Sequence, residues 1–143
     1  MEKNKDLKRL KANFAFNKII QIKEESEDKK NDLGENFKSH IKNIPIYIYN
    51  NGLIYTLSFI VYKSNKHDKS YTYIKNILLE YLKKSFVYGY ENFRNKEFDD
   101  TIKFLTECSS KDYRKITIEI LSILEWLIRF SDGMLEGEEN GEK

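Results

Sequence analysis

The stretch from Ser109 to Leu135 constrains the fold of this chain more than any other segment. Its large apolar residues recur every three or four positions, the spacing that places them on one side of an α-helix. That side comprises Tyr113, Ile116, Ile120, Ile123, Leu124, Leu127 and Phe130. The opposite side carries Lys111, Lys115, Ser122 and Arg129 together with Ile118 and Trp126. The first set predicts a long helix packed in a helical domain, and the second predicts a surface suited to a partner or a nucleic-acid backbone.

Residues that interrupt helices are scarce in this chain. The 143 residues include one Pro and six Gly, whereas a fold of many short strands needs a turn every few residues. The sequence therefore predicts an all-α fold, a single compact bundle of about six helices. These helices are expected over Leu7–Ile22, Phe37–Tyr49, Leu53–Tyr62, Tyr71–Val87, Phe98–Leu105 and Ser109–Leu135. Gly89 is expected to end the fourth, and Ser109 with Asp112 resembles a capping box for the last.

The segment around Pro45 leaves two alternatives open. Residues Ile44–Tyr49 alternate as in a strand, and Asn51-Gly52 suits a two-residue hairpin turn. The four-three-four spacing of apolar residues favours instead one helix kinked by Pro45, and we prefer this interpretation. The residues on that spacing are Phe37, Ile41, Ile44 and Ile48. The preceding segment, Glu24–Asn36, is highly charged and is predicted to be a frayed helix end and loop.

Charge is spread unevenly along the chain. The net charge is +2, but the last 13 residues carry five acidic side chains and one Lys, so the first 130 carry +6. This pattern predicts one helical domain over residues 1–135 and an acidic, flexible tail over 136–143. The basic body permits a polyanionic partner. A single cysteine, no apolar run of membrane-spanning length and no signal peptide predict a cytoplasmic protein.

The sequence lacks the residue patterns that carry catalysis. His40 and His67 do not have the spacing of paired metal ligands and are expected to lie on the surface. Cys108 has no obvious partner base, and no Gly-rich phosphate loop occurs. We therefore expect a protein that is not an enzyme and that needs no cofactor or metal.

The charged and aromatic side chains allow a binding role instead. Lys and Arg neutralise phosphates irrespective of base sequence, and aromatic rings can stack on unpaired bases. Rings considered for such stacking are Tyr47, Tyr49, Tyr71 and Tyr88. The bases of the last helix could equally form ion pairs one turn apart, Lys115 with Glu119 and Arg129 with Glu125.

Two groups of residues together resemble a known family. The first group is Lys42-Asn43-Ile44-Pro45, Asn51-Gly52-Leu53, Leu57-Ser58-Phe59 and Lys63. The second is Tyr113-Arg114, Thr117, Glu119, Leu124, Trp126-Leu127 and Arg129-Phe130. Their order and spacing, from about Ala12 to Leu135, resemble the small subunit of Cmr complexes, the type III-B CRISPR effectors. Ile128 departs from the pattern, because a Lys is common there in the family.

The resemblance implies a small all-α subunit without enzymatic activity. Such subunits stack, several copies deep, into a minor filament and line the groove where guide RNA and target RNA pair. The implied partners are other Cmr subunits, especially the backbone subunit, further copies of the chain itself, and both RNAs, with no membrane.

Six residues are candidates for RNA or subunit contact: Lys18, Lys42, Lys63, Arg114, Lys115 and Arg129. Arg114, Arg129, Lys42 and Lys63 carry over from the family's motifs, whereas Lys18 and Lys115 rest on charge and helix position. The alternative function is a helical protein–protein adaptor with no direct nucleic-acid role.

Overall fold

The computed structural model describes residues 2–66 and 68–137. Within these ranges the chain forms seven α-helices, one short 3-10 helix (η1) and no strand, so the all-α prediction is confirmed. The elements are α1 (Glu2–Lys29), α2 (Leu33–Ile41), α3 (Ile44–Asn51), α4 (Leu53–Ser64), α5 (Lys69–Leu82), η1 (Tyr90–Asn92), α6 (Phe98–Glu107) and α7 (Ser110–Met134). Residues 138–143, most of the predicted acidic tail, and His67 lie outside the described residues.

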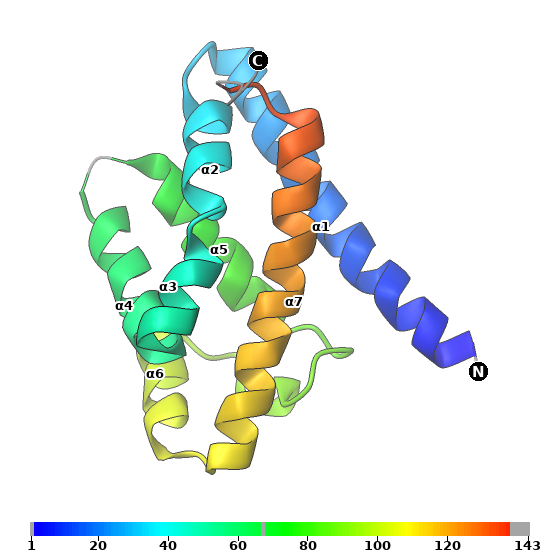
Figure 1. Ribbon diagram of the computed structural model, residues 1–143, viewed down its shortest axis with the longest axis vertical. Helices are drawn as coiled ribbons and strands as arrows, with labels where there is room; N and C mark the ends of the chain where they lie inside the picture. Colours follow the sequence, from blue (N-terminus) through cyan, green and yellow to red (C-terminus); the bar gives the residue numbers. More distant parts are fainter. Residues whose placement is uncertain (1, 67, 138–143) are drawn as a thin grey trace.

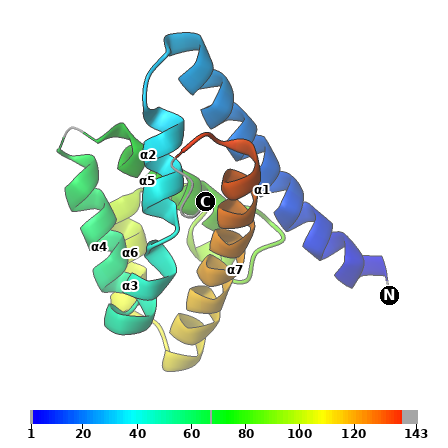
Figure 2. The same cartoon turned by 45° about the horizontal axis from the view of Figure 1, so that its top comes forward.

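Helix α7 is the common packing partner of the fold. It contacts α1 along much of its length and also contacts α2, α3 and α5, while α4 packs mainly on α5 (Figure 1). The apolar side predicted for α7 is buried at Ile116, Ile120, Ile123, Leu124 and Leu127, whereas Tyr113 and Phe130 at its ends are partly buried. The N-terminal turns of α1 extend beyond the other helices in both views (Figure 2). The core therefore forms around α7, and one end of α1 stands away from it.

The single kinked helix predicted over Phe37–Tyr49 is wrong in one respect, because the chain forms two helices there. Helix α2 ends at Ile41 and α3 begins at Ile44. Pro45 lies in the first turn of α3, where its missing N–H would have had no helical partner. The apolar residues on the predicted spacing are all buried, since the two helices continue one seam. The rival strand and hairpin are also wrong: Gly52, at φ +88°, joins α3 directly to α4.

The prediction of a frayed end and loop over Glu24–Asn36 is wrong as well. Helix α1 continues to Lys29, and α2 has begun by Leu33. The tight connection is stabilised by polar side chains: Ser26 Oγ accepts from the Gly34 N–H at 3.1 Å and donates to the Asn31 carbonyl at 3.0 Å. Leu33 is buried and anchors the turn. Apolar periodicity missed this segment because hydrogen bonds and one apolar anchor order it.

For the last helix, the predicted N-cap at Ser109 is confirmed, but the predicted return contact from Asp112 is not formed. Ser109 Oγ accepts from the Asp112 N–H at 3.0 Å, as an N-cap does. The Asp112 carboxylate does not reach back to Ser109, and instead accepts from the Tyr88 hydroxyl at 2.6 Å. Helix α5 also ends at Leu82, earlier than predicted, and turns lead from there to Gly89.

Candidate nucleic-acid interface

The end of α2 together with α3 and α4 forms a part of the molecule without acidic side chains. Residues 36–67 contain no Asp or Glu, although 23 of the 143 residues are acidic. The same segment contains Lys38, Lys42, Lys63 and Lys66. We call residues 36–67 the acid-free segment. The exposed lysines of this segment can attract a polyanion, and the segment itself contributes no carboxylate that would repel it.

Two predicted site residues, Lys42 and Lys63, belong to the acid-free segment. Lys42 is exposed directly after α2. Lys63 is half-buried at the end of α4, with its Nζ 5.9 Å from the ring centre of Phe59 and 5.7 Å from that of Tyr71. Burial, with smaller effects of Tyr47 and Asp68, raises the pKa of Tyr71 to about 12, so this phenol stays neutral. Lys63 is thus a cation held against aromatic rings.

Three predicted site residues, Arg114, Lys115 and Arg129, lie exposed on α7. Lys115 Nζ lies 5.1 Å from the ring centre of Tyr88. Arg114 and Arg129 are 15 positions apart, which is about 22 Å along a helix. Neither expected pair, Lys115–Glu119 or Arg129–Glu125, is among the ion pairs of the described residues. The three cations are therefore spread along α7 rather than gathered in one patch.

The sixth candidate, Lys18, faces the protein. Its Nζ forms an ion pair with Glu80 Oε1 at 2.7 Å and lies 5.5 Å from the ring centre of Phe14. The lysine side chain is only 17% exposed. These contacts join α1 to α5 and leave Lys18 little surface for a polyanion.

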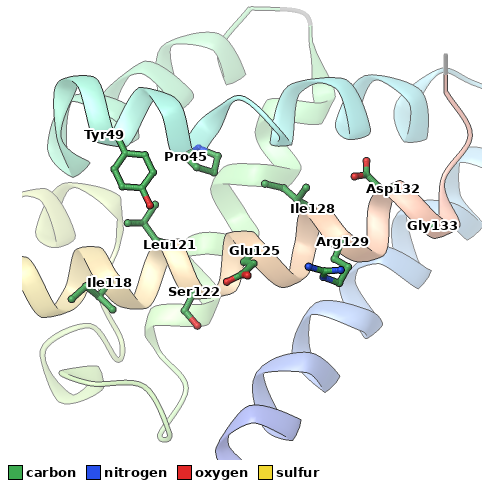
Figure 3. A pocket seen from close by; sticks show the side chains of 10 residues that line it. All are labelled: Pro45, Tyr49, Ile118, Leu121, Ser122, Glu125, Ile128, Arg129, Asp132 and Gly133. Carbon is green, nitrogen blue, oxygen red and sulfur yellow. The ribbon is translucent and has the colours of Figure 1, made fainter. Parts of the chain in front are cut away.

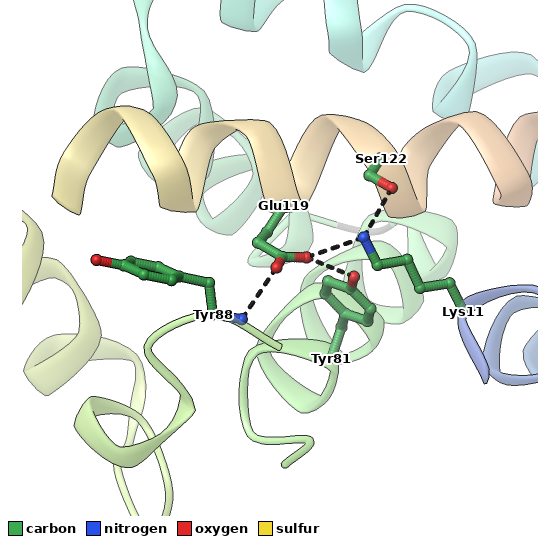
Figure 4. A network of polar contacts seen from close by, with 5 residues as sticks. All are labelled: Lys11, Tyr81, Tyr88, Glu119 and Ser122. Carbon is green, nitrogen blue, oxygen red and sulfur yellow. Dashed lines mark hydrogen bonds and ion pairs between the residues drawn. The ribbon is translucent and has the colours of Figure 1, made fainter. Parts of the chain in front are cut away.

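Glu119 lies at the centre of a polar network that sequence reasoning did not find (Figure 4). Its Oε1 accepts from the Tyr81 hydroxyl at 2.8 Å and lies 3.3 Å from Lys11 Nζ. Its Oε2 accepts from the Tyr88 N–H at 2.9 Å, and Lys11 also donates to Ser122 at 3.3 Å. Burial and the adjacent carboxylate raise the pKa of Tyr81. The network joins α1, α5 and the turn before η1 to α7.

Tyr113 connects the two sequence groups on which the resemblance is based. Its hydroxyl oxygen accepts from the N–H groups of Leu53 and Ile54, at 3.1 and 3.2 Å. These N–H groups belong to the first turn of α4, which has no side-chain cap of its own. A methyl group at Gly52 would lie 3.4 Å from the same hydroxyl. Tyr113 thus fixes the start of α4 against α7.

A groove of about 1030 Å³ runs between α3 and α7 (Figure 3). Its wall is largely apolar, through Pro45, Tyr49, Ile118, Leu121 and Ile128. Its polar lining consists of Ser122, Glu125, Arg129 and Asp132. Tyr49 and Ile118 are 73% and 58% exposed, which is unusual for large apolar side chains without a partner. The groove has the composition of a contact surface.

His40 is half-buried rather than a surface residue, so that prediction is wrong. Its ring stacks on Tyr71 at 4.5 Å, and Nδ1 lies 2.8 Å from Ser70 Oγ and 3.3 Å from Asp68 Oδ2. Ser70 Oγ donates to Asp68, the N-cap of α5, and is almost inaccessible. The three residues therefore fix the start of α5 against α2 and do not form an activated nucleophile.

The remaining residues considered for chemistry have no catalytic surroundings. Burial raises the pKa of the Cys108 thiol, which disfavours the reactive thiolate. No group of three or more His, Cys, Asp or Glu residues in the described ranges could hold a metal ion. No helix formed by those residues is both long and apolar enough to cross a membrane.

Of the rings considered for stacking, only Tyr49 is mostly exposed. Tyr71 is buried, Tyr47 packs edge-on against Phe59, and the Tyr88 hydroxyl is bound to Asp112. The most exposed rings besides Tyr49 are Tyr55 and Tyr62 on α4, which the sequence reasoning missed. The inward spacing of Leu53, Leu57 and Ile60 was the signal that could have placed them outside.

Comparison with known protein families identifies a match over most of the chain. The sequence model of the family described as CRISPR-associated protein (Cas_Cmr5) matches residues 7–134. The match covers all of the helices from the second turn of α1 to the end of α7. It includes both sequence groups quoted above.

Proposed function

Because this chain belongs to the Cmr5 family of CRISPR-associated proteins and is a subunit of a Cmr complex, we propose that it is the non-catalytic small subunit of a type III-B complex. In this role several copies stack into a minor filament in the cytoplasm. The filament contacts the other Cmr subunits, especially the backbone subunit, and stabilises the groove where guide and target RNA pair. Base pairing with the guide RNA then reads the target sequence, and this subunit contacts the sugar–phosphate backbone and stabilises the duplex.

The observation that carries the RNA role is the acid-free segment. Two of its lysines, Lys42 and Lys66, are exposed and no carboxylate of the segment competes with a phosphate for them. On α7, by contrast, the exposed Arg129 shares its groove with Glu125 and Asp132. A phosphate backbone is therefore favoured more strongly along α2–α4 than along α7.

The groove between α3 and α7 is assigned to protein contact. Its wall is apolar and its rim contains both signs of charge, which suits a protein surface better than a polyanion. A subunit with separate RNA and protein surfaces can line an RNA groove while it remains fixed in an assembly.

Charge reversal tests the RNA role. In a guide-loaded Cmr complex containing Lys42→Glu and Lys66→Glu, target RNA should bind more weakly. The dependence of log affinity on log salt should also become shallower, by about 0.7–0.9 for each phosphate that these lysines no longer neutralise. Lys83→Glu with Lys111→Glu is the matched control, because both lysines are exposed and lie outside the acid-free segment. Unchanged affinity and salt dependence in the double variant would contradict the RNA role.

The adaptor function is the second candidate, and the α3–α7 groove is the observation that favours it. An adaptor predicts that groove variants fail to assemble and that Lys42→Glu with Lys66→Glu leaves the RNA affinity of intact complexes unchanged, whereas the RNA role predicts weaker binding in that double variant. Native purification from the source cells provides an independent test of the whole proposal. Co-purification of guide RNA with larger Cmr subunits is expected, and their absence would contradict membership of the complex.

A further inference from the structure

We propose that Tyr55 and Tyr62, on the outer face of α4, stack on unpaired bases of single-stranded RNA, and that Lys66 contacts the adjoining phosphates. The proposal rests on the RNA role proposed above and identifies the part of the surface that performs it. It assigns to α4 a preference for unpaired over paired RNA, which the lysines alone would not give.

The position of the two tyrosines on α4 supports this role. They are seven residues apart, two helical turns, so their side chains lie one above the other about 10 Å apart. The two residues are 61% and 59% exposed. In the part of the chain that the structure describes, neither ring takes part in an aromatic pair. Tyr55 therefore presents an accessible ring, and Tyr62 can present the ring face opposite the Lys66 ammonium.

The opposite face of α4 already holds the helix in the core. Leu53, Leu57 and Ile60 are buried, and Thr56 is completely inaccessible. Large aromatic rings are thus not required on the outer face for packing. Small polar residues would serve there equally well for stability.

The electrostatics around the two rings suit a phosphate chain. Lys66 Nζ lies 4.8 Å from the ring centre of Tyr62. The first acid after the acid-free segment, Asp68, is already bound: Oδ1 accepts from Ser70 N–H at 3.0 Å and Oδ2 lies 3.3 Å from His40. A strand whose bases stack on the tyrosines would therefore bring its phosphates close to Lys66.

The composition of the outer face distinguishes RNA from a protein partner. Its exposed residues are Tyr55, Ser58, Tyr62, Asn65 and Lys66, with no aliphatic side chain among them. The α3–α7 groove differs from this face, because its wall includes the aliphatic side chains of Ile118, Leu121 and Ile128. Paired bases hide their faces in the duplex, whereas unpaired bases can stack on aromatic rings. The features together favour single-stranded RNA.

Substitutions that remove or keep the ring test the proposal in assembled, guide-loaded Cmr complex. The probes are a non-complementary oligoadenosine and an RNA duplex of the same length. Tyr55→Leu with Tyr62→Leu should weaken oligoadenosine binding at least tenfold and leave duplex binding unchanged. Tyr55→Phe with Tyr62→Phe should retain the wild-type affinity, because the ring remains. Tyr49→Leu, another exposed tyrosine but in the groove, is the control and should change neither probe.

Each other outcome overturns a distinct statement. If the Leu pair binds oligoadenosine normally while Lys42→Glu with Lys66→Glu weakens target RNA, stacking is wrong and the RNA role stands. If the Phe pair is as weak as the Leu pair, the hydroxyls act and the stacking proposal is wrong. If the Leu pair fails to enter the complex although it folds normally, α4 is a protein contact.

Photocrosslinking of RNA that contains 4-thiouridine adds an independent readout. We expect crosslinked peptides from residues 53–66. Crosslinks confined to α7 would contradict the proposal.

Discussion

At the scale of single residues, Glu119 has the largest number of polar contacts to distant parts of the chain. Its side chain is 13% exposed and is matched by Lys11, 16% exposed, with two further donors on Tyr81 and Tyr88. A paired and hydrogen-bonded carboxylate in such a place is costly to remove, because the partner cation stays behind without its counter-charge. Glu119 is thus a structural residue, although it belongs to the sequence group that carries the family resemblance.

We predict that Glu119→Ala lowers the free energy of unfolding by about 2 kcal/mol. The decrease reflects the unmatched Lys11 ammonium and the unbound Tyr81 hydroxyl. Urea unfolding followed by circular dichroism measures it. Glu125→Ala, at an exposed position on the same helix, should change stability by less than about 0.5 kcal/mol. Equal decreases in the free energy of unfolding for the two variants would show that the polar network around Glu119 does not stabilise the fold.

His40 makes stability depend on pH. Burial lowers its pKa below the usual 6.5 and nearby Lys63 acts in the same direction, while Asp68 opposes them. The folded state therefore binds fewer protons than the unfolded state, and the stability contributed by neutral His40 is present above pH 6.5 and lost as the pH falls below it.

The prediction for His40 compares how steeply stability depends on pH in the wild-type protein and in His40→Gln. Wild-type protein should lose stability as the pH falls through 6.5, the usual value for His. His40→Gln should lose less over the same interval, since Gln keeps a hydrogen-bonding side chain near Ser70 but does not titrate. Thermal unfolding in a series of buffers measures both slopes. A variant whose slope equals that of the wild type would assign the dependence to other groups.

At the scale of elements, Gly52 and Gly133 differ in whether the backbone conformation at their position requires glycine. Gly52 joins α3 to α4 at φ +88°, ψ 166°, a region that residues with a side chain rarely adopt. Gly133 lies inside α7 with nothing within 4 Å of a Cβ atom. One position therefore needs glycine, whereas the other only tolerates it.

Substitution by Ala should accordingly have opposite signs at these two positions. We predict that Gly52→Ala destabilises the fold by about 1–3 kcal/mol through backbone strain. Gly133→Ala should stabilise it by up to about 1 kcal/mol, because Ala has the higher helix propensity. Parallel urea titrations measure both. Stabilisation by Gly52→Ala would mean that the α3–α4 joint relaxes to another conformation.

At the scale of the whole molecule, the protein carries two chemically different exteriors. The end of α2 and the outer face of α4 carry exposed lysines and tyrosines of the acid-free segment, whereas α3 contributes Pro45 and Tyr49 to the α3–α7 groove, an apolar surface with mixed charges. We propose that the first faces RNA and the second faces protein. In this proposal the two surfaces carry the function of the subunit.

The groove yields a prediction about assembly. Ile118→Glu should reduce incorporation of this subunit into the Cmr complex several-fold, because a charge would enter an apolar wall. Its stability should change by less than about 0.5 kcal/mol, since Ile118 is 58% exposed. Affinity co-purification measures incorporation, and Gln21→Glu on the exposed side of α1 controls for added charge. Normal incorporation of Ile118→Glu would remove the groove from the protein interface.

Local patterns alone determined the helical class, the apolar side of α7 and the cap at Ser109, because residues three and four apart share a helix face whatever surrounds them. They did not determine where polar side chains find partners. Lys11 and Ser122 are 111 residues apart, and Tyr113 reaches Ile54 across 59, so no local spacing encodes either contact. The division at Pro45, the burial of Lys18 against Glu80 and the exposure of Tyr55 and Tyr62 were decided by how the helices pack. Packing sets which faces water reaches, and that choice fixed the candidate site.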